Sequence, residues 1–235
     1  MMEDQLKDID WQRVAEDLHQ QGYARIRDLM TADQCNALIQ GYEEESLYRK
    51  TVVMERHRFG KGTYKYFNYP LPPMIHELRA GIYPHLASTA NRWMEFLRMV
   101  PRYPDTLEAF HLLCKATGQS LATPLILKYG AGGYNTLHQD LYGEIYFPFQ
   151  IVIFLSAPGK DYTGGEFVMT EQVPRAQSRA IVMSPEMGNA LVFATSFRPV
   201  KGTRGYYRAS MRHGVSTLLS GRRYTAGIIF HDAKS

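Results

Sequence analysis

Hydrophobic residues recur along the chain with two different periods, and the change lies near residue 121. In residues 73–120 apolar side chains return every three or four positions, which predicts amphipathic helices. An earlier helix is expected to end at Gly22. Another is expected to begin at Thr31, because threonine is a good N-cap residue in front of an apolar stripe. The first half of the chain is therefore predicted to be mainly helical.

Beyond residue 121 the pattern consists of short apolar runs separated by glycine, proline, asparagine and aspartate. Many short strands joined by turns are typical of a β-sandwich or barrel. We therefore predict an α+β fold, in which a double-stranded β-helix (jelly roll) core in residues 121–235 is flanked by the N-terminal helices of residues 1–120. No stretch resembles a flexible boundary, so residues 1–235 are expected to form a single domain.

One segment of the N-terminal part, residues 46–70, differs from the helices around it. Gly60 and Gly62 mark a turn between two aromatic runs, so this segment is predicted to form a strand-turn-strand lid. Its cations and rings are interleaved: Arg49, Lys50, Arg56, Arg58, Lys61 and Lys65 with Tyr48, Phe59, Tyr64, Tyr66, Phe67 and Tyr69. A second basic stretch lies at residues 201–223, and the hypothesis is that both stretches border one opening.

The composition is that of an ordinary globular protein: of 235 residues, 45% are hydrophobic and 21% are charged. Cys35 and Cys114 lie far apart without a metal-binding or redox motif, so buried thiols in a reducing compartment are expected. No apolar leader or membrane-length run is visible, and we expect a cytoplasmic protein without membrane association or an obligate protein partner. The net charge of +4 permits an anionic partner such as nucleic acid without identifying one.

Candidate chemistry is concentrated around residue 138, in the segment NTLHQDLYGE. His138 and Asp140 are two positions apart, and on a strand such residues point to the same side. A third candidate, His213, lies in a later strand-like run. Two histidines and one carboxylate leave open positions on a metal, an arrangement typical of non-haem Fe(II) oxygenases. We therefore predict these three residues as metal ligands and catalytic residues.

An arginine after the second histidine extends this pattern. Arg223 follows His213 by ten residues and lies in the next predicted strand, so it can point into the same barrel. Arginine binds a carboxylate through two parallel charge-assisted hydrogen bonds, which suits an enzyme that uses a 2-oxo dicarboxylate. Strand alternation places the neighbouring Arg222 on the other face, as a solvated charge.

Together these motifs resemble the Fe(II)/2-oxoglutarate-dependent dioxygenase superfamily: HQD, then GGEF at residues 164–167, then HGV followed by GRRY. The segment YGAG…LHQD is similar to the AlkB-type nucleic-acid demethylases, and most of the chain resembles the bacterial nucleic-acid-modifying oxygenases called Oxygenase-NA. The resemblance implies Fe(II) and 2-oxoglutarate as cofactors and dioxygen as oxidant, with ascorbate as the reductant in vitro. It also implies that Tyr129, nine positions before His138, contacts the cosubstrate.

Two departures from the AlkB pattern limit what carries over. AlkB proteins have a late arginine at the substrate besides the one that binds 2-oxoglutarate, whereas no arginine follows Arg223 in this chain. They also have an asparagine two positions before the cosubstrate tyrosine, where this chain has Leu127. The late substrate arginine of AlkB therefore has no counterpart here.

Three hypotheses remain for the function. The first is oxidation of methyl groups on modified nucleobases in DNA or RNA, by demethylation or by 5-methylcytosine oxidation. In that case Arg56 and Arg58 contact phosphates, and Tyr64 and Tyr66 stack on bases. The second is hydroxylation of a protein side chain or a small metabolite. The third is a binding barrel without turnover, which three candidate metal ligands together with Arg223 argue against.

Overall fold

The computed structural model describes residues 2–100, 102–141 and 143–234. All of its α-helices lie before residue 121: α1 (Met2–Lys7), α2 (Trp11–Gln21), α3 (Ala32–Gln40), α4 (Pro73–Phe96) and α5 (Leu107–Ala116). Two 3₁₀ turns directly follow α3, η1 (Gly41–Glu43) and η2 (Glu45–Leu47), and a third, η3 (Met54–His57), lies within the segment of residues 46–70. The helical spacing predicted for residues 73–120 is thus confirmed as α4 and α5.

The strands form two antiparallel sheets. The larger has the order β1 (Tyr23–Ile26), β11 (Ala190–Ala194), β7 (Phe149–Phe154), β14 (Leu218–Ile229), β5 (Leu125–Gly130), β4 (Thr63–Phe67), β2 (Tyr48–Val53), with β8 (Tyr162–Gly164) also paired to β14. The smaller has the order β10 (Arg179–Met183), β9 (Phe167–Gln172), β13 (Gly205–Val215), β6 (Tyr134–His138), β3 (Gly60–Lys61), with β12 (Phe197–Gly202) paired to β13. Aromatic residues bridge the sheets, because the ring of Phe167 in β9 lies 5.2 Å from that of Phe193 in β11.

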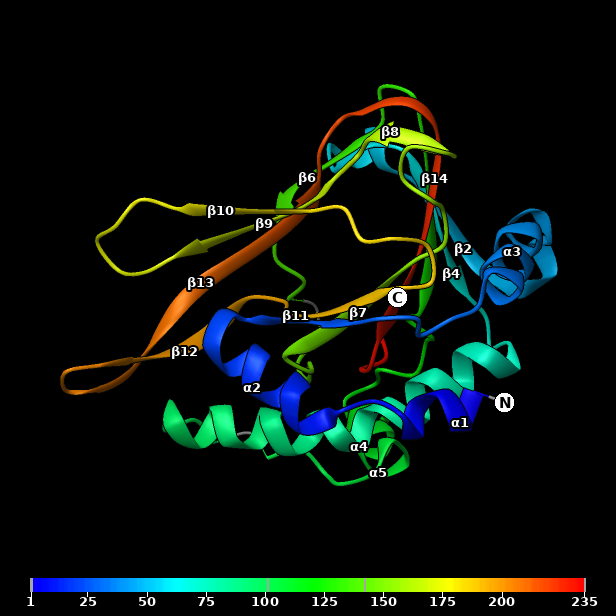
Figure 1. Ribbon diagram of the computed structural model, residues 1–235. Coiled ribbons are helices and arrows are strands. Elements are labelled where there is room, and N and C mark those ends of the chain that lie inside the picture. Colours follow the sequence, from blue (N-terminus) through cyan, green and yellow to red (C-terminus); the bar gives the residue numbers. More distant parts are fainter. Residues whose placement is uncertain (1, 101, 142, 235) are drawn as a thin grey trace.

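The helices cover the outer face of the larger sheet, with α4 and α2 beneath β11 and β7 (Figure 1). Trp93 of α4 meets Phe149 of β7 edge-to-face, with 4.6 Å between ring centroids, and both are fully buried. The predicted α+β jelly roll with flanking helices is therefore confirmed. In the described part of the chain no helix has the length and apolarity needed to cross a membrane.

Local sequence signals account for the helix ends. Thr31 begins α3 with a capping box, in which its hydroxyl accepts a hydrogen bond from the Gln34 backbone and the Gln34 side chain accepts one from the Thr31 backbone. Gly22 ends α2 with a φ of 80°, a left-handed conformation that glycine adopts without steric strain. Both predicted boundaries are confirmed.

Residues 46–70 form the predicted strand-turn-strand, but they are not a separate lid. β2 and β4 pair with each other, and β4 also pairs with β5, so both strands belong to one edge of the larger sheet. β1 extends the opposite edge by pairing with β11, some 160 residues later in the chain. The description of residues 1–120 as mainly helical therefore missed that three of their strands complete the main sheet, because their partners are distant in sequence.

Candidate metal centre

His138, Asp140 and His213 converge on one point between β6 and β13. These two strands pair in register at His138 and His213, which places both imidazoles side by side. Asp140 follows the end of β6, and its carboxylate oxygens lie 3.5 Å from Nε2 of His138 and 3.3 Å from Nε2 of His213. One potential ligand atom from each residue lies within 4.8 Å of the others. The chain thus gathers two imidazoles and one carboxylate where a single cation can contact all three.

Neighbouring contacts set the orientation and the proton of His138. Its Nδ1 lies 2.7 Å from the carbonyl oxygen of Thr136, a contact that requires the proton to sit on Nδ1 and leaves Nε2 as a free lone pair. Burial lowers the pKa of His138, and the nearby His213 lowers it further, while Asp140 opposes both effects. A neutral imidazole with Nε2 facing the cluster is the form that binds a metal.

Gln139 anchors the turn between the two residues of the HQD motif. Its amide nitrogen donates to the carbonyl oxygens of Ser196 at 2.6 Å and Met211 at 2.9 Å. Met211 lies on β13, two residues before His213, so Gln139 ties the two strands that carry the cluster.

A pocket of about 280 Å³ opens onto this cluster. Besides the three residues of the cluster, its lining comprises Met54, Phe59, Tyr64, Tyr66, Leu125, Asn135, Thr136, Gln139 and Gln150. Tyr64 and Tyr66 were predicted to lie at the substrate, and they form an edge-to-face pair with 5.4 Å between ring centroids. Burial raises the pKa of both phenols, so both are neutral at physiological pH.

Among the lining residues that were not predicted as site residues, Phe59 and Gln150 bear most directly on substrate binding. Phe59 was visible only as one ring among several in residues 46–70, and nothing local distinguished it. Gln150 carried a signal: it is the only polar residue in the strand FQIVIF. A polar side chain in a fully buried strand is more informative than an apolar one, because its burial requires a partner.

Arg223 lies inside the barrel beside this pocket, and its side chain is 1% exposed. None of its three guanidinium nitrogens has a hydrogen-bond partner among the described residues, and the same holds for the buried hydroxyl of Tyr129. Arg223 and Tyr129 pair across β14 and β5, and the guanidinium carbon lies 5.7 Å from the tyrosine ring centroid. Burial raises the pKa of Tyr129 to about 12, although the Arg223 charge opposes this rise.

This arrangement fits a bound dicarboxylate. A buried cation without a counterion is unfavourable unless a ligand completes it, and a carboxylate matches the arginine fork. Met54 and Tyr64 connect the two regions, because both pack in the cluster around Tyr129 and both line the pocket. The neighbouring Arg222 is exposed, as strand alternation predicted.

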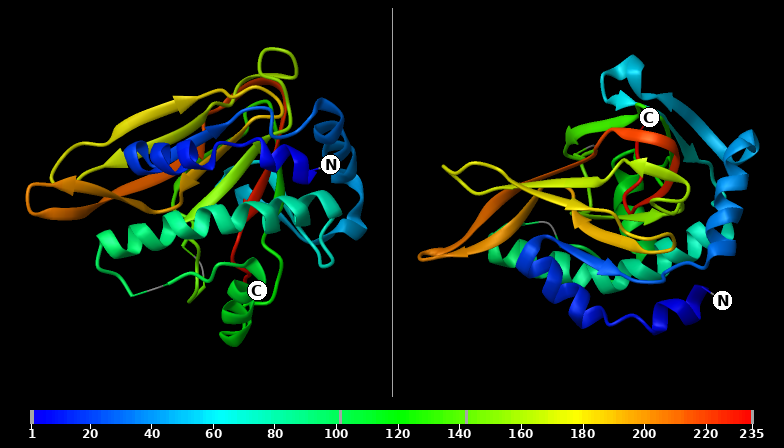
Figure 2. Two further views of the ribbon diagram at one scale, coloured as in Figure 1. Left: turned by 60° about the horizontal axis from the view of Figure 1, so that its bottom comes forward. Right: turned by 45° about the horizontal axis from the view of Figure 1, so that its top comes forward.

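The structure does not bring the two basic stretches to one opening. Arg56 and Arg58 are exposed on and after η3 and do not line the pocket. On β13, Arg212 points away from the face that carries His213 because successive strand residues alternate. The turn between β12 and β13 projects from the molecule at the end away from β2 and β4 (Figures 1 and 2). The hypothesis of a shared basic rim is therefore wrong for residues 201–212.

Some cations of residues 46–70 support the fold instead. Lys65 is buried and forms an ion pair with Glu45 at 2.5 Å. Arg49 donates to the carbonyl oxygen of Ala122 at 2.7 Å and lies over the Tyr66 ring. Local sequence pattern does not separate such packed cations from solvated ones.

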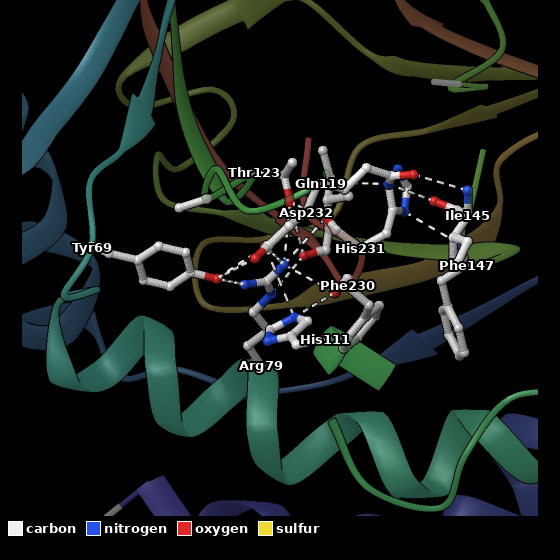
Figure 3. Close-up of polar contacts among 12 residues, drawn as sticks. Tyr69, Arg79, His111, Gln119, Thr123, Ile145, Phe147, Phe230, His231 and Asp232 are labelled. Atoms are coloured by element: carbon white, nitrogen blue, oxygen red, sulfur yellow. Dashed lines mark hydrogen bonds and ion pairs between the residues drawn. The ribbon is translucent and has the colours of Figure 1, made fainter. Parts of the chain in front are cut away.

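A buried polar network braces the chain beyond Asp140 (Figure 3). Gln119 donates to the carbonyl oxygen of Ile145 and accepts from its backbone nitrogen, while the Phe147 nitrogen donates to Nδ1 of His231. Burial, and to a smaller extent the Arg79 charge, lowers the pKa of His231 to about 4. His231 is therefore neutral, as an acceptor at Nδ1 requires.

Arg79 of α4 holds the end of the chain in the same network. Its guanidinium donates to Asp232 at 2.8 Å, to the hydroxyl of Tyr69 at 2.7 Å and to the carbonyl oxygens of Ile229 and Phe230. We refer to Arg79, Tyr69, Asp232, His231 and Gln119 with their partners as the Arg79 network. The network fixes the segment that follows β14, and through Gln119 and His231 it holds residues 145–147.

Residues 62–233 match the Oxygenase-NA family, described as an oxygenase catalysing oxidative methylation of damaged DNA. Uncharacterized proteins from two strains of Mycobacterium tuberculosis are 48% identical over 167 residues, which span 71% of this chain and 72% of each relative.

Solved structures share the fold at low identity. A prolyl-4-hydroxylase from Pseudomonas putida has a TM-score of 0.56 at 13% identity, with 100% of both chains covered. An oxidoreductase of the 2OG-Fe(II) oxygenase family from Burkholderia pseudomallei has a TM-score of 0.56 at 16% identity, with 96% of this chain and 94% of that chain covered. The chain therefore belongs to the Oxygenase-NA family and is an oxidoreductase of the Fe(II)/2-oxoglutarate oxygenase class.

Proposed function

We propose that this protein oxidises methyl groups on modified nucleobases of DNA or RNA, using Fe(II), 2-oxoglutarate and dioxygen. The observation that carries the proposal is the pairing of two features in one barrel. Three potential metal ligands face a small pocket with tyrosine walls, and beside it lies a buried arginine without a partner. The family description, which names damaged DNA, supports the choice of substrate.

In this proposal each residue has a defined task. His138, Asp140 and His213 hold Fe(II), and Arg223 binds the distal carboxylate of 2-oxoglutarate with Tyr129 donating a further hydrogen bond. When bound, Fe(II) and 2-oxoglutarate would supply the electrons that activate dioxygen for the oxidation of a C–H bond. The protein's own contribution is to orient the methyl group and to exclude water from the pocket.

The substrate base is proposed to enter between Tyr64, Tyr66 and Phe59. Phe59 is 47% exposed at the pocket mouth, where an unstacked base can pack against its ring. The exposed Arg56 and Arg58 flank Phe59 in sequence and supply charges for the adjacent phosphates. A base taken out of its stack leaves its phosphates outside the pocket, which agrees with cations at the rim rather than inside.

The test is nucleoside mass spectrometry. Purified protein is incubated with Fe(II), 2-oxoglutarate and ascorbate, and with DNA and RNA oligonucleotides that carry single methylated bases. His138→Ala is expected to lose metal binding and to lower turnover at least ~100-fold, more than the 10–100-fold caused by changes outside the ligand shell. His76→Ala removes an exposed histidine of α4 and serves as the matched control.

Either outcome is informative. Loss or oxidation of a methyl mark by the wild type and the control alone supports the proposal and identifies the base. Succinate formation without any change in the oligonucleotides contradicts it and moves the substrate to a protein side chain or a metabolite. That second function is favoured so far only by the fold that the chain shares with prolyl hydroxylases.

A further inference from the structure

Gln150 of β7 has an unsatisfied amide inside the pocket of the metal centre. Its side chain is 8% exposed, and all residues of β7 are buried. Its Oε1 is shielded from solvent and finds no hydrogen-bond partner in the described part of the chain. A buried amide oxygen without a donor destabilises the fold, so its presence indicates a ligand that supplies the donor.

The sheet register places Gln150 on the pocket floor, facing the tyrosine wall. Tyr66 pairs with Leu125 across β4 and β5, and Leu125 pairs with Gly227 across β5 and β14. Gly227 has no side chain, and a Cβ atom there would lie 3.6 Å from the amide nitrogen of Gln150. Because Gly227 lacks a side chain, the pocket is open between Leu125 and Gln150. A flat ring can therefore pack against Tyr66 with its edge directed at the Gln150 amide.

The cosubstrate does not explain this amide. Gln150 pairs with Ile229, six residues beyond Arg223 along β14. At a rise of about 3.3 Å per residue this separates the two positions by roughly 20 Å along the strand. A five-carbon dicarboxylate anchored at Arg223 is much shorter than that distance. Gln150 lines the pocket beside the metal cluster and Arg223 does not, so we assign the amide to the ligand that occupies this pocket.

We propose that Gln150 is a specificity-determining residue that recognises an amino group on the edge of the substrate base. This inference rests on the proposed nucleobase function. A glutamine amide presents an acceptor and a donor side by side, and it pairs with a base edge that offers an amino donor next to a ring-nitrogen acceptor. The atom of the amide that lacks a partner is the acceptor Oε1, so the group that completes it is a donor.

Two matched pairs of bases test the inference, because each pair differs at C4 between an amino group and a carbonyl oxygen. The first pair is 5-methylcytosine and thymine, which share a methyl group on carbon. The second pair is 3-methylcytosine and 3-methylthymine, which share a methyl group on N3, so the amino group of 3-methylcytosine can meet Oε1 but no ring-nitrogen acceptor is left for the amide nitrogen. Each base is placed in the same oligonucleotide. Turnover is measured by mass spectrometry, and binding is measured by fluorescence anisotropy without oxygen.

The wild type is expected to favour 5-methylcytosine over thymine roughly tenfold or more, the discrimination that one good bidentate contact provides, and to favour 3-methylcytosine over 3-methylthymine by a smaller factor, because only the amino contact remains. Gln150→Met keeps the side-chain length without the amide and should reduce that ratio to about one. Gln150→Glu keeps an acceptor oxygen and should retain the preference. Gln172→Leu changes an exposed glutamine at the end of β9 and should behave as the wild type. Thermal melting of each variant verifies folding.

The outcomes separate the two proposals. A ratio that persists in Gln150→Met, or a wild type that favours the carbonyl members, overturns the role of Gln150 and leaves the nucleobase function standing. A wild type that neither binds nor oxidises any of the four bases, while still converting 2-oxoglutarate, overturns the nucleobase function and the role of Gln150 with it. Loss of the ratio in Gln150→Met alone supports both.

Discussion

Two arginines of this protein are equally buried, yet their surroundings are opposite. Arg79 is 0% exposed and Arg223 is 1% exposed. Arg79 donates hydrogen bonds to a carboxylate, to a phenol and to backbone carbonyls, as Figure 3 shows. Arg223 has aromatic rings around it, and none of its guanidinium nitrogens makes a well-formed hydrogen bond within residues 2–100, 102–141 and 143–234.

The difference shows how to distinguish a structural charge from a binding charge. Burial of a cation is tolerated when protein groups neutralise it and accept its hydrogen bonds, and the result stabilises the fold. Burial without such partners weakens the fold and persists where a ligand completes the site. By this criterion the Arg79 network belongs to the scaffold, and Arg223 is proposed to belong to the cosubstrate site.

The largest expected effect tests the scaffold side of the comparison. Arg79→Leu leaves Asp232 buried without its cation, and we expect it to lower the free energy of unfolding by about 3–5 kcal/mol. The same substitution at Arg223 removes a charge that has no partner, so we expect the free energy of unfolding of the metal-free protein to fall by less than about 1 kcal/mol. Urea unfolding followed by circular dichroism measures both. Equal losses would show that the two arginines stabilise the fold alike.

The next effect tests the functional side. Arg223→Leu is expected to weaken 2-oxoglutarate binding roughly tenfold or more, since hydrogen bonds to a charged group contribute about 1.5–3 kcal/mol. Arg223→Lys should recover only part of the affinity, because an ammonium lacks the planar fork. Arg222→Leu removes the exposed neighbour and is the matched control. Calorimetric titration with 2-oxoglutarate gives the affinities, and an unchanged affinity in Arg223→Leu would remove this residue from the cosubstrate site.

An effect spread over several pH units, and therefore small at each step, concerns the Arg79 network. Burial holds His231 neutral, with a pKa of about 4 against an ordinary value of 6.5. Between these values the unfolded chain binds a proton that the folded protein does not. The free energy of unfolding should therefore fall as the pH decreases from 6.5 to 4, with a slope of up to about 1.4 kcal/mol per pH unit from this group.

His231→Gln removes that titration and should flatten the slope over this interval, whatever its effect on absolute stability. The exposed His76→Gln should leave the slope as in the wild type. Urea unfolding of the metal-free proteins at several pH values measures the three slopes. A slope that His231→Gln leaves unchanged would mean that His231 is not the buried neutral histidine of the Arg79 network.

Much of the fold class and the core of the candidate site could be predicted from local pattern. A spacing of two puts His138 and Asp140 on one side of the chain, and the alternation along β14 separates Arg223 from Arg222. The cap at Thr31 and the break at Gly22 are also local, because they depend on the conformations of one or two residues. Such features need no knowledge of what lies across the sheet.

Tertiary structure decided the rest, because it depends on pairing between segments far apart in sequence. Residues 46–70, predicted as a lid, form a sheet edge because β4 pairs with β5. The same pairing places Tyr66 beside Leu125 at the pocket. The basic turn between β12 and β13 lies away from that pocket, because the β12–β13 hairpin projects in another direction. Sequence by itself determined which groups can bind a metal and a dicarboxylate. Only the packing decided that Arg79 is satisfied while Arg223 and Gln150 are not, since hydrogen-bond partners are supplied by the folded surroundings.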